Sequence, residues 1–373
     1  TAIFPAQAGY DTTTRTYFVI VGPDMSAPTV AMLNPQWVRT DSFGIVSLRF
    51  RLYDNYYMLN MSNCEIHVDG NMAYWAPSVM PGAQVEVNVS GQVVRVLKNI
   101  DAEAGNNIYL TIDQRLQKKA EELLEGKAGA VVAMEPSSGQ ILAMTSKPSF
   151  DPNEFVCGLT HDKWKNIISQ PNRPMENKAI KGEYPPASTY KIVTAIAALE
   201  EKVIDINTSF YCPGYIKYGN REFRCWKKGG HGSVNVVRAL AESCDVFFYN
   251  VGQRLDIDKL AWYAKACGLG APTGIGLEQE GAGLIPSAIW KKKRFGTAWS
   301  SGETLSAVIG QGYNLVTPLQ MLALTSSIAN GGKGIKPTVM KRIETPEGRL
   351  ITESNLEILG NLPVSQSTLN IVK

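Results

Sequence analysis

Short runs of alternating apolar and polar residues fill the first 92 residues of the chain. TRTYFVIVG, IVSLRFRLYD, CEIHVDG and AQVEVNVSG are four of them, and Gly, Pro, Asp or Asn residues separate one run from the next. Successive side chains of a β-strand point to opposite faces of the sheet, so this alternation predicts short strands joined by turns. We therefore predict an all-β sandwich for residues 1–92.

From Val93 onward the apolar residues follow the spacing of helices. TIDQRLQKKAEELLEG predicts a helix with Asp113 as its N-cap, and GAVVAMEPSSGQILAMTS predicts two strands around a Ser-Ser-Gly turn. Four more helices are predicted, from TYKIVTAIAALEE, NVVRALAESCDVFFYNVGQRL, DKLAWYAKACGLG and TPLQMLALTSSIANGG. In the last of these, Thr317 is the expected N-cap and Pro318 the first helical residue. This order predicts an α/β domain, a sheet flanked by helices, over residues 93–373.

The composition is that of a folded protein with two or more domains, and it excludes some functions. The chain has 373 residues, of which 44% are apolar, and a net charge of +3. Such a small charge, without a long basic run, argues against nucleic acid as a partner. The longest apolar stretch with a helical pattern, IVTAIAAL, is far shorter than the roughly 20 residues that a membrane span needs. Any export signal or membrane anchor is expected outside these residues.

A serine and a lysine stand three residues apart in EYPPASTYKIVTAIAALEEK, at the start of a predicted helix. A serine hydroxyl is a poor nucleophile at neutral pH and needs a neighbouring base. Spacing of three residues on a helix puts Ser188 and Lys191 on one face, and the free N–H groups of a helix start favour the negative charge of an attacked carbonyl. The pair fits a nucleophile and its general base. In the alternative interpretation, Ser188 only caps the helix and Lys191 is a solvated residue of its first turn.

Five sequence blocks around this pair favour the chemical interpretation. In chain order they are LTIDQRLQ, GAVVAMEPSSGQILAMTSKPSFDPN, NKAIKGEYPPASTYK, GHGSVNVVRALAESCDVFFY and IGQGYNLVTPLQM. Together they resemble the transpeptidase domain of class B penicillin-binding proteins, in particular the elongation-specific penicillin-binding protein 2 group. The resemblance runs from about residue 93 to the end of the chain.

The resemblance implies the residues of a serine acyl-transfer site. Enzymes of this type share the motifs Ser-x-x-Lys, Ser-Asp-Asn or its variants, and Lys-Thr-Gly. Ser188 maps to the acylated nucleophile, Lys191 to its base, and Ser243-Cys244-Asp245 to the second motif, where Asp is typical of the penicillin-binding protein 2 group. Ser233-Val234-Asn235 also fits the second motif. Because GHGSVN resembles a separate block of the family, we favour Ser243 and Asp245 as the catalytic residues.

The third motif, Lys-Thr-Gly or Lys-Ser-Gly, does not occur in the sequence. In the family it lies on an edge strand further along than TLNIVK, where it binds the substrate carboxylate and supplies one N–H group of the oxyanion hole. We therefore expect the chain to be truncated at the C-terminal end of the domain. Removing one oxyanion-hole donor lowers the rate of other enzymes by about 10²–10³, so the activity of this chain is left open.

The resemblance implies the activity of a peptidoglycan D,D-transpeptidase. Ser188 would attack the D-Ala–D-Ala bond of a stem peptide, release the terminal D-Ala and pass the acyl group to an amine of a second strand. β-Lactams would acylate the same serine. The family acts in the periplasm or at the outer face of the cytoplasmic membrane, held by an N-terminal anchor, and its implied partner is an elongation-complex glycosyltransferase. The alternatives are a non-catalytic wall-binding or scaffold protein with a decayed or truncated domain, and a serine β-lactamase, against which the block order argues.

Three of the six cysteines and one of the three histidines fall in one short segment, at Cys212, Cys225, His231 and Cys244. Three thiolates and one imidazole make the closed tetrahedral set that structural Zn²⁺ prefers, and some members of the penicillin-binding protein 2 group carry zinc in this region. Cys244 lies inside the second motif, so the metal would hold the geometry of that motif. The alternatives are a Cys212–Cys225 disulfide and unrelated buried thiols.

Three further features have less specific interpretations. Residues 1–92 loosely resemble the immunoglobulin-like (Ig-like) modules of bacterial surface proteins, and not the usual N-terminal region of the family. IWKKKRFG is a short basic patch that we interpret as a solvated face, with contact to an acidic wall polymer as the alternative. Four aromatic residues would either line a peptide groove or pack against their neighbours, and we favour packing: Tyr184, Tyr190, Trp226 and Tyr313.

Overall fold

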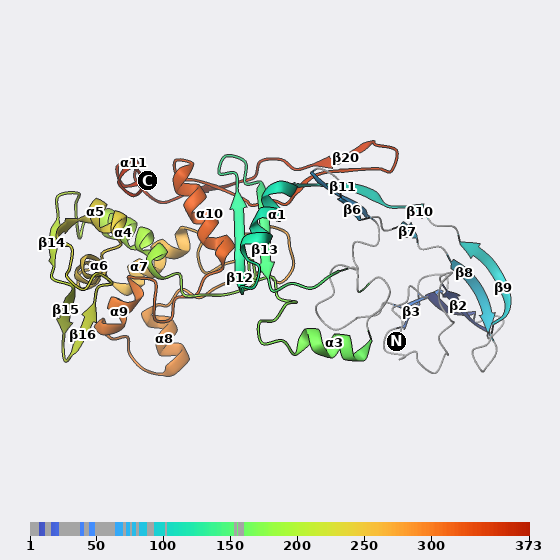
Figure 1. Cartoon of the computed structure of the whole chain (residues 1–373), viewed down its shortest axis with the longest axis horizontal. Coiled ribbons are helices and arrows are strands. Elements are labelled where there is room, and N and C mark those ends of the chain that lie inside the picture. Colours follow the sequence, from blue (N-terminus) through green and yellow to red (C-terminus); the bar gives the residue numbers. More distant parts are fainter. Residues whose placement is uncertain are drawn as a thin grey trace. The chain divides into compact units, whose positions relative to one another are not determined.

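The computed structural model describes residues 105–152, 155 and 160–373 with their side chains, and strand segments within residues 1–104. Figure 1 shows the elements along the whole chain. The chain divides into two compact units. The first consists of Thr1–Thr111, Ser149–Met175 and Met340–Ser354, and the second of the three segments Ile112–Pro148, Glu176–Val339 and Asn355–Lys373. The boundary that we expect at residue 92 remains a prediction.

The first unit contains two larger sheets. One has the strand order β3 (Val38–Thr40), β4 (Ile45–Leu48), β1 (Gln7–Asp11), β2 (Thr16–Val21), β8 (Gly82–Val87) and β9 (Val93–Ile100), and all its pairs are antiparallel. The other has the order β20 (Leu350–Glu353), β19 (Met340–Glu344), β11 (Asn106–Asp113), β5 (Cys64–Asp69) and β6 (Met72–Tyr74).

One further strand pair and one helix also belong to the described part of this unit. Strand β10 (Glu103–Ala104) pairs with β7 (Pro77–Val79), and helix α3 (His161–Ile168) begins after Thr160, whose side chain caps it. Much of residues 1–92 lies outside the described residues. The Ig-like sandwich therefore remains a prediction.

A two-stranded hairpin with helices packed against it forms one part of the second unit. Strand β12 (Gly129–Met134) pairs with β13 (Ile141–Lys147), α1 (Gln114–Leu123) packs against β13, and α10 (Pro318–Ala329) packs against β12, as Figure 1 shows. Helix α10 also contacts β18 (Lys333–Ile335), which pairs with β21 (Ile358–Asn361). These elements confirm the predicted α/β domain.

The predicted N-caps of helices α1 and α10 are both observed. The Asp113 carboxylate accepts hydrogen bonds from the N–H groups of Arg115 and Leu116, at 2.8 and 3.2 Å. Thr317 and Gln320 form a capping box before α10, with Pro318 as the first helical residue. Side-chain caps of this kind satisfy the N–H groups that a helix start leaves without partners.

Helix α4 (Lys191–Glu200) lies at the centre of a second, helical part of this unit. Residues 193–198 are fully buried, so α4 is apolar on every side rather than along one stripe. Its neighbours are α5 (Val236–Ala241), α6 (Asp245–Gly252), α7 (Ile257–Ala266) and α11 (Gln366–Val372). Because α4 begins at Lys191, the packing that fixes α4 also fixes this lysine.

Short elements surround this helical core. Strand β14 (Ser209–Cys212) pairs with β17 (Gly232–Asn235), and β15 (Tyr215–Tyr218) pairs with β16 (Arg221–Arg224). Helices α8 (Ala288–Phe295) and α9 (Ser301–Ala307) follow, and α9 packs against α6. In the part of the chain that the structure describes, no helix is both long and apolar enough to cross a membrane.

The segment NVVRALAESCDVFFYNVGQRL, predicted as one helix, forms two. Helix α5 ends before Glu242 and α6 begins at Asp245, because Ser243 between them has a left-handed backbone with φ of 54°. The apolar spacing continues across the break and gives no sign of it. The side chain of Lys191 donates to the Ser243 carbonyl, so a contact with a distant residue accompanies the break.

The packing between α4 and α7 allows a test of the helical core. Leu260 on α7 is 1% exposed, so Leu260→Ala is expected to lower the free energy of unfolding by about 2–5 kcal/mol through lost burial and the cavity that remains. Urea unfolding followed by circular dichroism measures this change. Ile289→Ala is the control: that side chain is 76% exposed, so the change is expected to stay within about 0.5 kcal/mol. Equal effects of the two substitutions would contradict the packing described for α7.

Candidate active site and metal centre

Ser188 lies at the surface on a short, rigid turn before α4. Residues Ala187–Tyr190 form a 3-10 helix, η4, in which Ser188 is exposed and Tyr190 is 1% exposed. Ala187 has a left-handed backbone with φ of 49°, and its N–H donates to the Gly310 carbonyl at 2.9 Å. The turn is thus held by a buried ring on one side of Ser188 and by a backbone contact on the other.

Gly310 makes this backbone contact possible. A Cβ atom at this position would lie 2.3 Å from the Ala187 carbonyl oxygen and 2.6 Å from Cβ of Tyr190, and the backbone φ is +71°. Only glycine tolerates both the approach and the conformation without strain. The hydroxyl of Thr194 on α4 donates to the nearby Val308 carbonyl at 2.7 Å, which ties the same loop to α4. Gly310 lies in the block IGQGYN but is not among the predicted site residues, because no local pattern marks its contact with Ala187.

The side chain of Lys191 is buried, and its ammonium group donates its hydrogen bonds to residues at the break between α5 and α6. Its side chain is 1% exposed, and Nζ donates to Ser243 Oγ and the Ser243 carbonyl, both at 2.9 Å, and to Asp245 Oδ1 at 2.6 Å. A lysine ammonium has three donors, so its hydrogen bonds are complete. The Phe248 ring lies with its centroid 5.7 Å from Nζ and excludes water from that side. The structure therefore brings Lys191, Ser243 and Asp245 together.

Ser188 and Lys191 are linked through the backbone. The Lys191 N–H donates to the Ser188 carbonyl where η4 passes into α4. Within the described residues no hydrogen bond joins the Ser188 hydroxyl to Nζ of Lys191, which is turned toward Ser243 and Asp245. Catalytic hydrogen bonds often tighten only when the substrate is bound, so this geometry is compatible with a nucleophile and base.

The competing pair, Ser233 and Asn235, has structural roles. Ser233 lies on β17 opposite Tyr211 of β14, and the Asn235 side chain caps α5 by accepting a hydrogen bond from the Arg238 N–H at 3.1 Å. Neither residue has a hydrogen bond to Lys191 among the described contacts, whereas Ser243 has two. The geometry therefore favours Ser243-Cys244-Asp245 as the second motif.

Cys212, Cys225, His231 and Cys244 meet in one buried cluster. Their ligand atoms all lie within 4.8 Å of one another, and Nδ1 of His231 is 3.6 Å from Sγ of Cys212 and 3.4 Å from Sγ of Cys225. A tetrahedral zinc with Zn–S of about 2.3 Å and Zn–N of about 2.05 Å places its sulfur and nitrogen ligands about 3.6 Å apart. All four residues are buried, and the three cysteines are free thiols.

The protonation of Cys244 and the surroundings of His231 bear on whether the cluster could bind a metal. Burial raises the pKa of the Cys244 thiol to about 12, so it becomes a thiolate at neutral pH only when a cation binds it. Nε2 of His231 is buried without a hydrogen-bond partner, 4.0 Å from Oε2 of Glu242. This arrangement suits a histidine that binds metal through Nδ1 and carries its proton on Nε2, facing a carboxylate. The residues present therefore fit a closed tetrahedral metal site.

The four aromatic candidates have different environments. Tyr190 is buried in the core, and Tyr313 packs against Trp290, Phe295 and Trp299, with ring centroids 5.1 to 6.3 Å away. Tyr184 is 43% exposed and Trp226 is 65% exposed. Packing is therefore the observed role of two of the four, and Trp226 is the most exposed of the set.

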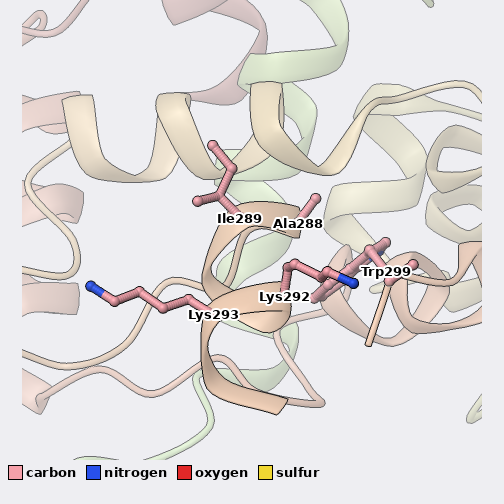
Figure 2. A pocket seen from close by; sticks show the side chains of 6 residues that line it. Ala288, Ile289, Lys292, Lys293 and Trp299 are labelled. Carbon is pink, nitrogen blue, oxygen red and sulfur yellow. The ribbon is translucent and has the colours of Figure 1, made fainter. Parts of the chain in front are cut away.

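The basic patch IWKKKRFG forms helix α8. Ala288, Ile289, Lys292 and Lys293 line a hollow of about 500 Å³ together with Ala298 and Trp299, and in Figure 2 the two lysine side chains leave the helix in opposite directions. Lys292 donates to the Gly296 carbonyl that ends the helix, at 3.1 Å. Lys292 and Lys293 are exposed, as expected for a solvated face, but Lys291 is buried and donates to Oε2 of Glu303 at 2.6 Å, so the expectation holds for only part of the patch. None of the catalytic candidates lines this hollow.

Comparisons with known proteins identify the family of the chain. Residues 129–373 match the penicillin-binding protein transpeptidase domain family. Peptidoglycan D,D-transpeptidase MrdA of Haemophilus influenzae is 44% identical over 263 residues, which are 70% of this chain and 40% of that protein. The crystal structure of Pseudomonas aeruginosa PBP2 in complex with WCK 5153 has a TM-score of 0.66 and 35% identity, covering 74% of this chain and 62% of that one. The complex of Helicobacter pylori PBP2 with MreC has a TM-score of 0.65 and 34% identity, covering 78% and 52%.

The chain belongs to the penicillin-binding protein transpeptidase family. Its relatives include MrdA proteins and penicillin-binding protein 2 structures, so the group predicted from the five sequence blocks is confirmed. The chain spans about 40% of the length of the curated relatives that it matches.

Gly310 and Gly302 form a matched pair for testing the nucleophile turn. Gly310→Ala is expected to lower the free energy of unfolding by about 2–5 kcal/mol, because it combines a left-handed alanine with a clash against Ala187. Gly302 lies inside α9, and a Cβ atom added there would meet no other atom within 4 Å, so Gly302→Ala is expected to raise stability by about 0.5–1 kcal/mol. Urea unfolding measures both. A neutral Gly310→Ala would show that the close approach is not needed.

Proposed function

We propose that this chain is the acyl-transfer part of a peptidoglycan D,D-transpeptidase, with Ser188 as its nucleophile. The observation that carries the proposal is the buried amine of Lys191, which donates hydrogen bonds to Ser243 and Asp245. Lys191 directly follows the turn that holds the exposed Ser188. A serine nucleophile with a lysine base and a second hydroxyl in contact with that base is the arrangement that such acyl transfer requires. The MrdA relatives, which carry the name peptidoglycan D,D-transpeptidase, support it.

The reaction proceeds in two acyl transfers. Ser188 Oγ attacks the carbonyl of the penultimate D-Ala while Lys191, with one proton fewer than the ammonium form, accepts the hydroxyl proton. The Ser243 hydroxyl, in contact with Nζ, relays that proton to the departing amine of the terminal D-Ala. An amine of a second stem peptide then attacks the Ser188 ester, gives up its proton along the same path and restores the serine. Asp245 holds Nζ in position throughout.

The backbone around Ser188 supplies part of the oxyanion site. The Ser188 N–H is the first donor expected for the negative oxygen of the tetrahedral intermediate, and the start of α4 favours that charge. The second donor in the family comes from the Lys-Thr-Gly strand, a motif that the 373 residues do not contain. We therefore expect slow acylation in this chain alone.

The substrates and partners follow from the same proposal. Stem peptides of peptidoglycan are the acyl donors and acceptors, and β-lactams acylate Ser188 as dead-end substrates. Peptidoglycan is cross-linked outside the cytoplasm, so we expect the chain to act in the periplasm or at the outer face of the cytoplasmic membrane. The solved complex of H. pylori PBP2 with MreC supports an assembly with elongation proteins, in which an elongation-complex glycosyltransferase is the expected partner of this chain.

We also propose that Cys212, Cys225, His231 and Cys244 bind one structural Zn²⁺. The short ligand distances, the burial and the free thiols support this assignment over a Cys212–Cys225 disulfide. A closed Cys₃His site leaves no position for substrate, so the ion supplies rigidity rather than chemistry. The ion would fix the position of Cys244, which lies between Ser243 and Asp245 of the second motif.

For residues 1–92 we keep the Ig-like module as a proposal, supported by the alternating sequence pattern. Such a module favours one alternative function: a wall-binding or scaffold protein in which the transpeptidase domain no longer turns over. Covalent labelling by penicillin separates the two functions, because a scaffold needs no reactive serine.

The nucleophile can be tested by intact-mass spectrometry after incubation with a penicillin. One covalent adduct per chain is expected on the wild type, and none on Ser188→Ala. Ser233→Ala is the control, because Ser233 lies on β17 and has no contact with Lys191; it is expected to label like the wild type. An adduct on Ser188→Ala would refute Ser188 as the nucleophile, because another residue would then react. Absence of labelling in both the wild type and a longer chain with the Lys-Thr-Gly strand would favour the scaffold.

The metal can be tested by elemental analysis of the purified chain. One equivalent of zinc is expected in the wild type, and Cys225→Ser is expected to lower it to less than about a tenth, because removing one of four ligands opens the closed site. Cys267→Ser is the matched control: Cys267 is also a buried free thiol, but it ends α7 and is not part of the cluster. Zinc retained by Cys225→Ser, or its absence from the wild type, would refute the assignment.

A further inference from the structure

The turn that presents Ser243 to the base is strained. Ser243 has φ of 54°, in the left-handed region that L-residues other than Gly, Asn and Asp seldom adopt. In this conformation both its carbonyl and its hydroxyl accept hydrogen bonds from Nζ of Lys191. A strained residue persists only where its surroundings hold it, so the groups that hold Ser243 decide where the Lys191 amine points.

Trp226 binds both flanks of this turn. Its indole Nε1–H donates to the Glu242 carbonyl at 3.0 Å, directly before Ser243, and its backbone N–H donates to Oδ2 of Asp245 at 3.1 Å, two residues after Ser243. The other oxygen of the same carboxylate, Oδ1, accepts from Lys191 at 2.6 Å. Asp245 is thus held between Lys191 and Trp226, and its carboxylate cannot rotate without breaking one of the two bonds.

The position of Trp226 is set by the cysteine–histidine cluster. It directly follows Cys225, and its ring contacts the His231 imidazole edge-on, with centroids 5.5 Å apart. The side chain is nevertheless 65% exposed, although both of its N–H groups are bonded. Burial of apolar area therefore does not explain a tryptophan here, whereas the indole hydrogen bond to the Glu242 carbonyl does. The bond to Asp245 comes from the backbone N–H of the same residue, so it depends on where residue 226 is held.

We infer that Trp226 is a positioning residue, a clamp that fixes the Ser243 turn and, through Asp245 and Ser243, aims the Lys191 amine. The inference rests on the proposed function, in which Lys191 is the base for Ser188. Trp226 acts through other residues and has no direct part in the acyl transfer. Its loss loosens the turn and slows acylation, but leaves the non-covalent binding of a penicillin and the zinc content unchanged.

The kinetic test compares Trp226→Ala and Trp226→Phe with the wild type. Pre-steady-state acylation by a fluorescent penicillin separates the maximal acylation rate from the half-saturating concentration. Trp226→Ala is expected to lower the maximal rate about tenfold, the effect of losing the indole hydrogen bond to Glu242, without a change in the half-saturating concentration. Trp226→Phe keeps a ring beside His231 but has no N–H donor, so it is expected to lower the rate like Trp226→Ala; a wild-type rate in Trp226→Phe would show that the ring contact matters and the hydrogen bond does not. Trp262→Ala, a second exposed tryptophan on α7, is the control and is expected to behave as the wild type.

A second measurement does not depend on acylation. In ¹⁵N-correlated NMR spectra, the amide signals of Ser243 and Asp245 are expected to shift or broaden in Trp226→Ala and in Trp226→Phe, which both lack the indole N–H, and to keep their positions in Trp262→Ala. If neither the wild type nor a longer chain with the Lys-Thr-Gly strand is acylated, the proposed function fails while these spectra still test the clamp. Wild-type signals and rate in Trp226→Ala would overturn the inference. Loss of zinc from that variant would overturn it too, because Trp226 would then maintain the cluster and not the turn.

Discussion

The buried amine of Lys191 is the group on which the site depends. An ammonium removed from water costs several kcal/mol unless a counter-charge and further acceptors compensate it. Here the side chain is 1% exposed, and its acceptors are the Asp245 carboxylate and two oxygens of Ser243, more than 50 residues further along the chain. The α5–α6 segment must therefore keep the one conformation that offers all three oxygens to α4.

That conformation is held from several directions. Lys191 contacts the Ser243 turn from the core, the Cys244 thiol belongs to the cysteine–histidine cluster, and Trp226 donates hydrogen bonds to Glu242 and Asp245. The cluster and the reacting groups alternate along the sequence, since Cys244 lies between Ser243 and Asp245. Rigidity supplied by the cluster is therefore transmitted to the second motif by covalent bonds as well as by hydrogen bonds.

The nucleophile side of the site is rigid for a different reason. Ser188 lies at the start of α4, whose residues 193–198 are fully buried, and Gly310 approaches the Ala187 backbone more closely than any other residue type allows. The two halves of the site thus meet in Lys191, which belongs to α4 by its backbone and to the α5–α6 break by its side chain. Acyl transfer needs groups held at fixed separations, and such a junction provides them.

The sequence by itself determined the local elements and the family. The Asp113 cap, the hairpin of residues 129–147 and the Thr317–Pro318 start of α10 follow from short-range periodicity and capping, and the five motif blocks identified the transpeptidase family. The grouping of cysteines with His231 was also visible in the composition.

The tertiary structure alone decided the break between α5 and α6, the close approach of Gly310 and the two bonds of Trp226. The apolar spacing runs through Ser243 without interruption, so no local pattern marks the break. These features depend on contacts between residues that are far apart in the sequence, chiefly the need of one buried lysine for three oxygen acceptors, and only the folded chain brings those groups together.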